Sequence, residues 1–441
     1  MAALTAAKLV STTGSWTSTV AMPWLVLSTT GSPARMSLVL AAQVAGVVLL
    51  GVPGGTVVAR LGTRRTMLLG DAARAPLVAA VPLLFHLDAL AFPLLLGLAF
   101  AVGGFAAPYV AAQRLAVPEL VGEEPHRVAR ANSLVDGATR IGNLAGPALA
   151  GVLIGILGAA NVLWFDAGTF LLSFGIVLVL VHPRPHPAAA PAPASGAGQR
   201  RLPTIPALTP DTDRRPQPTI PTLTSDAGRR WLPAGIRVMA ADPALRWMAI
   251  SLLCVGVTYP LIMVTLPVLT TTRYGGDPRT YGALVAASGL GLAVGSLLAV
   301  WVSGRWPLAV LGGIAAVGAM GPLWLLPLPL TGLGTGAVLA VSGLFIPVFS
   351  TCLTSHFTLR VRAELRAQVM TSVVATENTA GFASYACGGM LLAAVGTRAA
   401  LLLAAIAGTG CTMALLVAMA AIIRDSADRA AGTGAGLASR T

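Results

Sequence analysis

The chain has 441 residues, of which 55% are hydrophobic and only 10% are charged. Soluble globular domains carry about 25% charged residues, so this composition excludes an ordinary soluble protein. The formal net charge of +13 could suggest a nucleic-acid partner, but the basic residues gather between apolar segments, which argues against one.

Twelve apolar segments follow one another along the chain. Each has roughly 20 residues or more, enough for a helix to cross a hydrocarbon core of about 30 Å. They are uniformly apolar rather than alternating, which favours helices over barrel strands. The sequence therefore predicts an all-α membrane protein with twelve transmembrane helices. The predicted spans are 9–30, 36–59, 66–86, 89–112, 130–157, 160–181, 245–272, 280–303, 307–327, 331–357, 367–395 and 397–423.

The positions of Lys and Arg orient these spans. Of the 29 basic residues, two lie within spans and only four lie on the side opposite the amino terminus, at Arg35, Arg273, Arg279 and Arg398. Because cytoplasmic loops carry an excess of Lys and Arg, both termini are expected in the cytoplasm. We therefore expect a multi-pass protein of the cell membrane.

A change in composition separates two groups of six spans. Residues 182–242 hold twelve prolines and eight arginines and almost no apolar run, which is typical of an extended or disordered linker. The expected domains are a six-helix bundle at 1–181, a cytoplasmic linker at 182–242, a second six-helix bundle at 243–424 and a cytoplasmic tail at 425–441.

The second six spans repeat features of the first six. Three pairs of segments match at nearly constant separation: 23–31 with 267–275, 55–59 with 295–299, and 132–142 with 371–381. This pattern indicates two bundles related as parallel repeats. Such repeats support alternating access around a central site.

The turn between the second and third spans is short and strongly basic. Its sequence, G-T-V-V-A-R-L-G-T-R-R at 55–65, places cations where anionic headgroups and helix carboxyl ends attract them. We expect a cytoplasmic gate there, although the arginines could instead only orient the hairpin. The expected gate residues are Gly55, Arg60, Gly62, Arg64, Arg65, Asp71 and Arg74.

The fifth span carries small residues around a proline. Gly142, Gly146 and Gly151 allow another helix backbone to approach closely. Pro147 interrupts the helical hydrogen bonds and kinks the helix. This segment is expected to form a hinge or seal beside a cavity, or else only to pack against a neighbouring helix.

Ionisable residues inside the spans indicate function, because a charge in hydrocarbon is costly and usually faces a cavity. Asp136 and Arg140 share one helix face, and Glu377 lies on the eleventh span. A carboxylate in an apolar cavity binds a proton more readily, which suits reversible proton loading. We expect Glu377 and Asp136 to be proton-coupling acids with Arg140 as counter-ion; a static Asp136–Arg140 salt bridge is the alternative. Asp166 is expected to be structural.

These motifs resemble those of the major facilitator superfamily. The basic turn is similar to its G-x-x-x-D-R-x-G-R-R signature, although Ala59 replaces the acidic residue and Thr63 replaces a basic one. The glycine–proline segment at 142–151 is similar to the motif of the superfamily's drug–proton antiporters. Segments 23–33 and 165–167 resemble the branch that contains macrolide-type and siderophore exporters.

The resemblance implies the major facilitator fold, with the basic turn holding the cytoplasmic ends of the two bundles together. The superfamily's fourth-span Arg motif is missing, because residues 97–112 contain no charge. The resemblance also implies which spans line the cavity, and their aromatic, Met and Asn side chains suit amphipathic ligands. The candidate substrate contacts are Trp16, Met22, Phe105, Tyr259, Met263, Phe345, Phe349 and Asn378.

We predict a secondary transporter, not an enzyme, that exports small amphipathic molecules from the cytoplasm by proton antiport, as a monomer and without a cofactor. The sequence has no G-x-x-x-x-G-K-[ST] nucleotide motif, so an ion gradient is expected to drive transport. The four cysteines lie inside spans without metal-ligand spacing, so no metal site is expected. The alternatives are an importer or facilitator of a small polar solute, or a membrane sensor or scaffold that does not transport.

Overall fold

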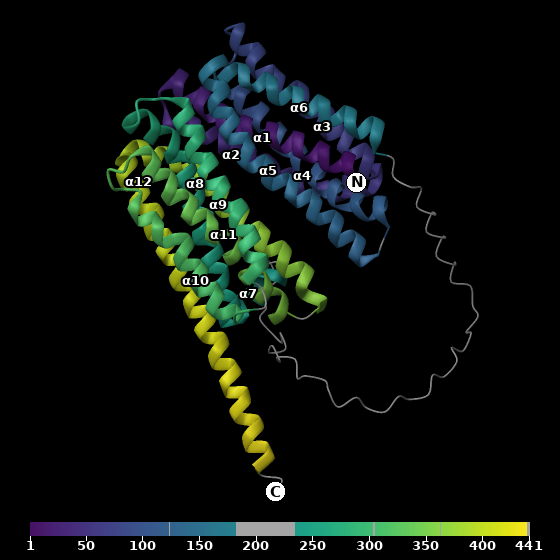
Figure 1. The fold of residues 1–441 in the computed structure, drawn as a ribbon, viewed down its shortest axis with the longest axis vertical. Coiled ribbons are helices and arrows are strands. Elements are labelled where there is room, and N and C mark those ends of the chain that lie inside the picture. Colours follow the sequence, from purple (N-terminus) through teal and green to yellow (C-terminus); the bar gives the residue numbers. More distant parts are fainter. Residues whose placement is uncertain (123, 182–233, 303–304, 362, 439–441) are drawn as a thin grey trace, which may run out of the picture.

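The computed structural model describes residues 1–122, 124–181, 234–302, 305–361 and 363–438, and every regular element in these residues is helical. Figure 1 shows two bundles side by side, α1–α6 and α7–α12. The elements are α1 (Ala2–Thr30), α2 (Pro33–Leu61), α3 (Thr63–His86), α4 (Phe92–Val121), α5 (Pro125–Leu157), α6 (Ala159–Leu180), α7 (Ala234–Ala241), α8 (Pro243–Arg273), α9 (Pro278–Val302), α10 (Leu308–Met320), η2 (Gly321–Leu325), α11 (Gly332–Arg360) and α12 (Ala363–Ala438).

Helix α12 contains the last two expected spans. They meet at Gly396, where the backbone has φ 79° and ψ 171°. Only glycine adopts this conformation readily, so the kink falls at the one residue between the predicted spans 367–395 and 397–423. The other ten expected spans correspond to α1–α6, α8, α9, α10 with η2, and α11. The structure thus confirms the expected twelve-span architecture.

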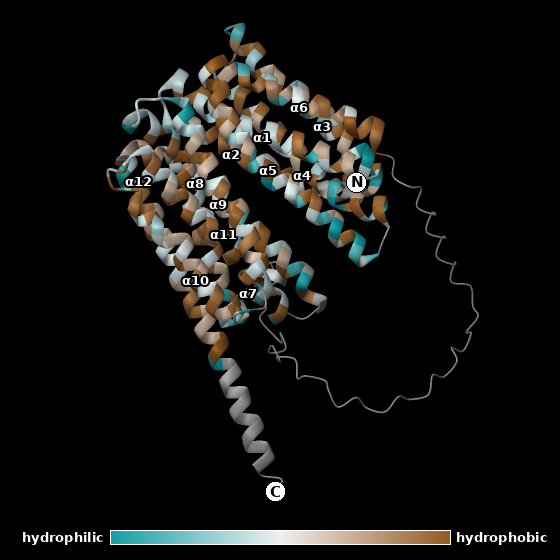
Figure 2. Ribbon diagram, viewed as in Figure 1, coloured by the Kyte–Doolittle hydropathy of each residue, from teal (hydrophilic) through white to brown (hydrophobic). Residues whose placement is uncertain are grey.

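In the described part of the chain, ten helical segments are long and apolar enough to cross a membrane, with α12 counted once. Helix α1 falls outside this set because seven of the nine residues at 11–19 are Ser or Thr. The hydroxyls of Thr13 and Ser15 donate to the carbonyls of Leu9 and Ser11 at 2.8 Å, so they need no water. Figure 2 shows hydrophobic residues along most of both bundles, as expected for surfaces that face lipid.

The two bundles repeat one packing pattern. In the N-terminal bundle α1 packs against α5 and α6, α2 against α4, and α3 against α4 and α6. In the C-terminal bundle α8 packs against α12, α9 against α11, and α10 against α11 and α12. These pairs correspond when α1 is matched with α8 and the two limbs of α12 with α5 and α6. The expected pseudo-repeat is therefore present in the packing as well as in the sequence.

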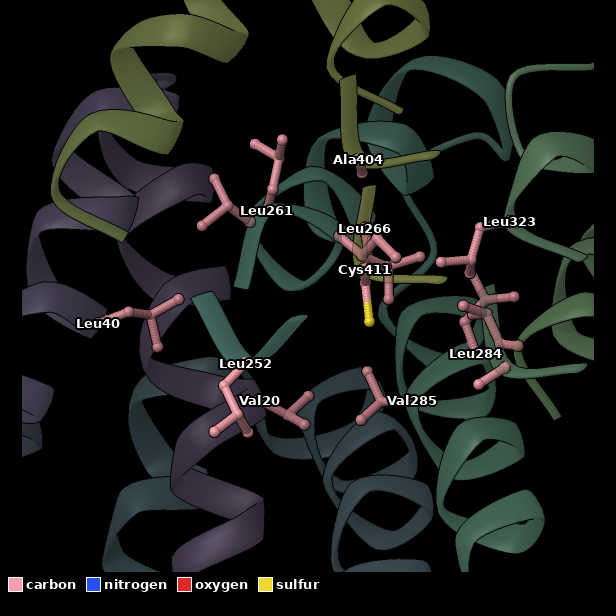
Figure 3. Close-up of a cluster of buried hydrophobic side chains, with 14 of the residues drawn as sticks. Val20, Leu40, Leu252, Leu261, Leu266, Leu284, Val285, Leu323, Ala404 and Cys411 are labelled. Atoms are coloured by element: carbon pink, nitrogen blue, oxygen red, sulfur yellow. The ribbon is translucent and has the colours of Figure 1, made fainter. Parts of the chain in front are cut away.

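The bundles contact each other mainly through two equivalent helix pairs, α5 with α9 and α2 with α12. A buried apolar cluster crosses this boundary. It includes Val20 and Leu40 of the N-terminal bundle together with Leu252 and Leu261 of the C-terminal bundle (Figure 3). Burial of apolar side chains from both bundles stabilises the interface between them.

Part of the predicted linker is helical. Residues 182–233 lie outside the described residues, but Ala234–Ala241 forms α7, which packs against α8 and α12. The helical C-terminal part therefore includes residues before 243. At the other end, α12 continues to Ala438, through most of the predicted tail.

Asp242 joins the start of α8 to α11. Its Oδ1 accepts the N–H groups of Ala244 and Leu245 at 2.8 and 3.2 Å, and its Oδ2 accepts Arg360 Nε at 2.7 Å. We expect Asp242→Ala to lower the free energy of unfolding by about 2–3 kcal/mol, because it removes a helix cap and a largely buried ion pair. Asp242→Asn keeps the cap and should cost less. Equal losses for the two variants, measured by unfolding in detergent, would contradict this account.

Candidate functional site

Successive helices run in opposite directions, so the bundles have two distinct ends. The turns at Gly31, Gly158 and Gly396 lie at one end, which we call the Gly158 end. The basic turn between α2 and α3 lies at the opposite end, which we call the Gly62 end.

Specific contacts join the bundles toward the Gly158 end. Trp24 of α1 stacks on Tyr281 of α9, with ring centroids 5.6 Å apart. The hydroxyl of Ser37 on α2 accepts the N–H of Gly389 on α12 at 3.1 Å. Both contacts lie near the helix termini of this end, so they close the space between the bundles there.

The glycine–proline motif of α5 lies between α1 and α9. Gly142 and Gly146 face α1, and Gly151 faces Gly282 of the C-terminal bundle. A Cβ added to Gly151 would lie 2.8 Å from Gly282 Cα, and one added to Gly282 would lie 2.8 Å from the carbonyl oxygen of Pro147. Backbone therefore meets backbone at this crossing, which leaves no room for a side chain on either glycine.

A cavity of about 230 Å³ lies between α2, α8 and α12. Four predicted site residues line it: Glu377 and Asn378 on α12, and Tyr259 and Met263 on α8. Val44 of α2 belongs to the other bundle, so the cavity lies between the halves. Among the described residues, Glu377 has no hydrogen-bond or ion-pair partner, and its side chain is exposed to this space.

The cavity also contains a residue that the sequence reasoning missed, Tyr385. Glu377, Gly381 and Tyr385 follow one another at four-residue intervals and all three line the cavity. Residues at this spacing share one face of a helix. The spacing from Glu377 was therefore a signal that could have identified Tyr385.

The other five predicted substrate contacts do not line this cavity. Met22 and Phe349 are 4% exposed and belong to the apolar core. Trp16 donates its Nε1–H to a side chain on α5 at 2.5 Å. Phe345 packs against α10, and Phe105 is an exposed residue of α4. Hydropathy indicates how deep in the membrane these residues lie, but it does not determine which face of its helix each residue occupies.

Asp136 and Arg140 on α5 are both exposed, and these two described residues form no ion pair with each other. Asp136 instead lines a second, polar pocket of about 560 Å³ together with Lys8 of α1 and Arg114 of α4. The cations that share a pocket with Asp136 thus come from two other helices, and the sequence reasoning missed both of them.

The described contacts of the basic turn lie within the N-terminal bundle. Arg64 Nη2 donates to the carbonyl oxygen of Leu178 at 2.6 Å, close to the end of α6, where a cation is favoured by the helix dipole. Arg60 and Arg65 are exposed. Gly55 lies in α2, and its surroundings fall outside the described residues. Thr63 Oγ1 also donates to Glu119 Oε2 on α4 at 2.5 Å. The described links of this turn therefore run from α3 to α4 and α6, within the N-terminal bundle.

Asp71 and Arg74 lie in the core of the N-terminal bundle, where they are 0% and 5% exposed. Arg74 Nη2 donates to Asp71 Oδ1 at 2.6 Å, and Ser173 Oγ donates to Asp71 Oδ2 at 2.7 Å. The guanidinium carbon lies 4.3 and 4.4 Å from the ring centroids of Tyr109 and Phe170. The pair therefore joins α3, α4 and α6 rather than lining the surface between the bundles.

Asp166 is a second buried carboxylate of this bundle, 1% exposed. Ser18 of α1 donates a hydrogen bond to its Oδ2, and Thr169 Oγ1 lies 3.2 Å from its Oδ1. The bond from Ser18 connects α6 to α1, which is a structural role, while the Thr169 contact lies within α6.

Two bundles with equivalent packing and a cavity between them are the arrangement that membrane transporters built from repeats share. Residues 4–385 match the Major Facilitator Superfamily. The chain belongs to this superfamily.

Curated relatives of the chain include two efflux pumps. The multidrug efflux pump Tap of Mycolicibacterium fortuitum is 28% identical over 296 residues, which cover 66% of this chain and 64% of that protein. The multidrug efflux pump Tap of Mycobacterium tuberculosis is 30% identical over 170 residues, which cover 38% of this chain and 41% of that protein. The chain thus spans less than two thirds of the length of these relatives.

Solved structures of transporters share the fold. A D-xylose–proton symporter superimposes with a TM-score of 0.68 at 13% identity, covering 94% of this chain and 96% of that one. An inward-facing, unoccupied bacterial homologue of the human lysosomal transporter Spinster gives a TM-score of 0.64 at 13% identity, covering 95% and 97%. At this identity the likeness establishes the fold alone.

Proposed function

We propose that the chain is an efflux pump that exports small amphipathic molecules from the cytoplasm across the cell membrane by proton antiport. The observation that carries the proposal is the unpaired carboxylate of Glu377 in a cavity between the two bundles. The multidrug efflux function of the Tap relatives supports export as the direction.

The cavity walls suit an amphipathic ligand. Tyr259, Met263 and Tyr385 provide aromatic and thioether surface, which adapts to ligands of different shape. The charge of Glu377 must be balanced by a proton or by a cationic group of the ligand, because no described side chain pairs with it. Exchange of proton for ligand on one carboxylate would couple their movements in opposite directions.

The conformation of the bundles supports uptake from the Gly62 end. Contacts such as Trp24–Tyr281 close the Gly158 end, while Asp136, Arg140 and Glu377 are exposed between it and the Gly62 end. We place the Gly62 end and both termini in the cytoplasm because of its excess of basic residues. The cavity is complete within one chain, so a monomer suffices for transport.

We expect Glu377→Gln to lower proton-driven transport at least tenfold, because the amide cannot exchange a proton for ligand. Transport of a fluorescent amphipathic cation into inverted membrane vesicles would be followed after a pH gradient is imposed. Glu124→Gln is the matched control, since Glu124 is an exposed residue paired with Arg127 at 2.7 Å and lies outside the cavity. Full gradient-driven uptake by folded Glu377→Gln protein would contradict the mechanism. Movement of the cation out of the vesicles, rather than into them, would favour an importer.

A further inference from the structure

The polar pocket near the Gly62 end shares no lining residue with the Glu377 cavity. It has a volume of about 560 Å³ and lies between α1, α4 and α5. Its polar lining consists of Lys8, Gln113, Arg114, Asn132, Asp136 and Thr139. Proton exchange at Glu377 gives these residues no role, so their grouping needs its own explanation.

The pocket carries one net positive charge. Lys8 and Arg114 form no ion pair with the described residues, and Asp136 is the one carboxylate in the lining. The neighbouring Asp71–Arg74 pair adds no net charge because its two members neutralise each other. A ligand with a single negative charge would therefore balance the pocket.

Gln113 gives a second, independent indication of a ligand. Its side chain lines the pocket and is 3% exposed, and its Nε2 has no hydrogen-bond partner among the described residues. A buried N–H donor without a partner costs about 1–3 kcal/mol. An oxygen atom of a bound anion would supply the missing acceptor.

The depth of the pocket matches the membrane interface. Lys8 lies six residues from the start of α1 and Gln113 eight residues from the end of α4, which is about 9 and 12 Å along the helices at 1.5 Å per residue. Helices of 29 and 30 residues are about 45 Å long, so they extend beyond a hydrocarbon core of about 30 Å. The pocket therefore lies within about one helical turn of the headgroup level.

We propose that this pocket binds a singly charged phosphodiester whose adjoining group carries hydroxyls, as in a glycerol phosphodiester. Lys8, Arg114 and Gln113 Nε2 hold the phosphate oxygens, and Asp136 and Asn132 accept hydrogen bonds from the hydroxyls. The same chemistry is present in a phosphatidylglycerol headgroup and in soluble glycerophosphoglycerol, and the experiment distinguishes these two sources.

Native mass spectrometry of the purified chain would count lipids retained from micelles that contain equal amounts of phosphatidylglycerol and phosphatidylcholine with the same acyl chains. We expect the wild-type chain to retain phosphatidylglycerol preferentially and the Lys8→Gln/Arg114→Gln variant to lose this preference at least tenfold. The Arg35→Gln/Arg305→Gln variant loses the same charge outside the pocket and should keep it. Displacement by millimolar glycerophosphoglycerol would show that the site also takes the free anion.

Equilibrium dialysis with glycerophosphoglycerol tests the soluble source directly. Binding that Lys8→Gln/Arg114→Gln abolishes, without lipid preference, would assign the site to the free phosphodiester. Absence of both lipid preference and dialysis binding, or equal loss in the Arg35→Gln/Arg305→Gln control, would overturn the proposal. If the double variant does not fold, Arg114→Gln alone replaces it in both measurements, because Arg114 is exposed. Gln113→Leu removes the unpaired Nε2 donor and tests its part in binding.

Discussion

Replacement of Arg74 by Met is expected to lower the free energy of unfolding by about 3–5 kcal/mol, the cost of leaving a buried charge without its partner. Asp71 is 0% exposed, and Arg74 is its cationic partner, at 2.6 Å. The stacking of the guanidinium between Tyr109 and Phe170 would be lost as well. Equilibrium unfolding in detergent would measure the difference.

Two further variants separate charge from packing. Arg65→Met removes an exposed Arg from the same helix and should change stability by less than about 1 kcal/mol. Asp71→Asn combined with Arg74→Met removes both charges and should regain much of the loss, because the uncompensated charge is gone. A double variant as unstable as Arg74→Met would show that packing, not charge pairing, dominates.

Replacement of Gly151 by Leu is expected to reduce transport at least tenfold while the protein still folds. The added side chain would meet the backbone of Gly282 on the other bundle, which cannot move aside without separating α5 from α9. The bundles could then no longer close at the Gly158 end, and one of the two states needed for alternating access would be lost. Vesicle transport, normalised to folded protein from size-exclusion chromatography, measures the effect.

Gly168→Leu is the matched control for this substitution. Gly168 lies in α6 with no heavy atom within 4 Å of an added Cβ, so leucine there should leave transport unchanged. Transport by Gly151→Leu at the wild-type rate would show that close approach at this crossing is not needed for the cycle.

The spans and their repeat could be predicted from the sequence, because both depend on the length and spacing of apolar runs. Even the break at Gly396 is visible as the one residue between two predicted spans. The direction in which a single side chain points, toward the bundle interior or toward a pocket, could not be predicted in the same way. Asp71 and Asp136 are both carboxylates within predicted spans, yet one is buried inside a bundle and the other lines an open pocket.

The orientation of each helix about its own axis explains why one carboxylate is buried and the other is exposed. Hydropathy reports the depth of a residue, whereas its neighbours depend on the face that it occupies and on which helix packs there. From the sequence, Lys8 and Arg114 count only among the basic residues that orient the spans, because they lie just outside the ends of spans 9–30 and 89–112. Their common pocket with Asp136 appears only when α1, α4 and α5 are packed together.

The connections at the Gly158 end have a further consequence. Those at 31–32, 87–91, 158, 274–277, 326–331 and 396 contain six residues or fewer. No such segment is long enough to form a lid over the mouth. In the proposed transport cycle we therefore expect that end to open by rotation of one bundle against the other, a movement that would displace the surrounding lipid. Bilayer thickness and lateral pressure, rather than loop sequence, would then set the rate of opening.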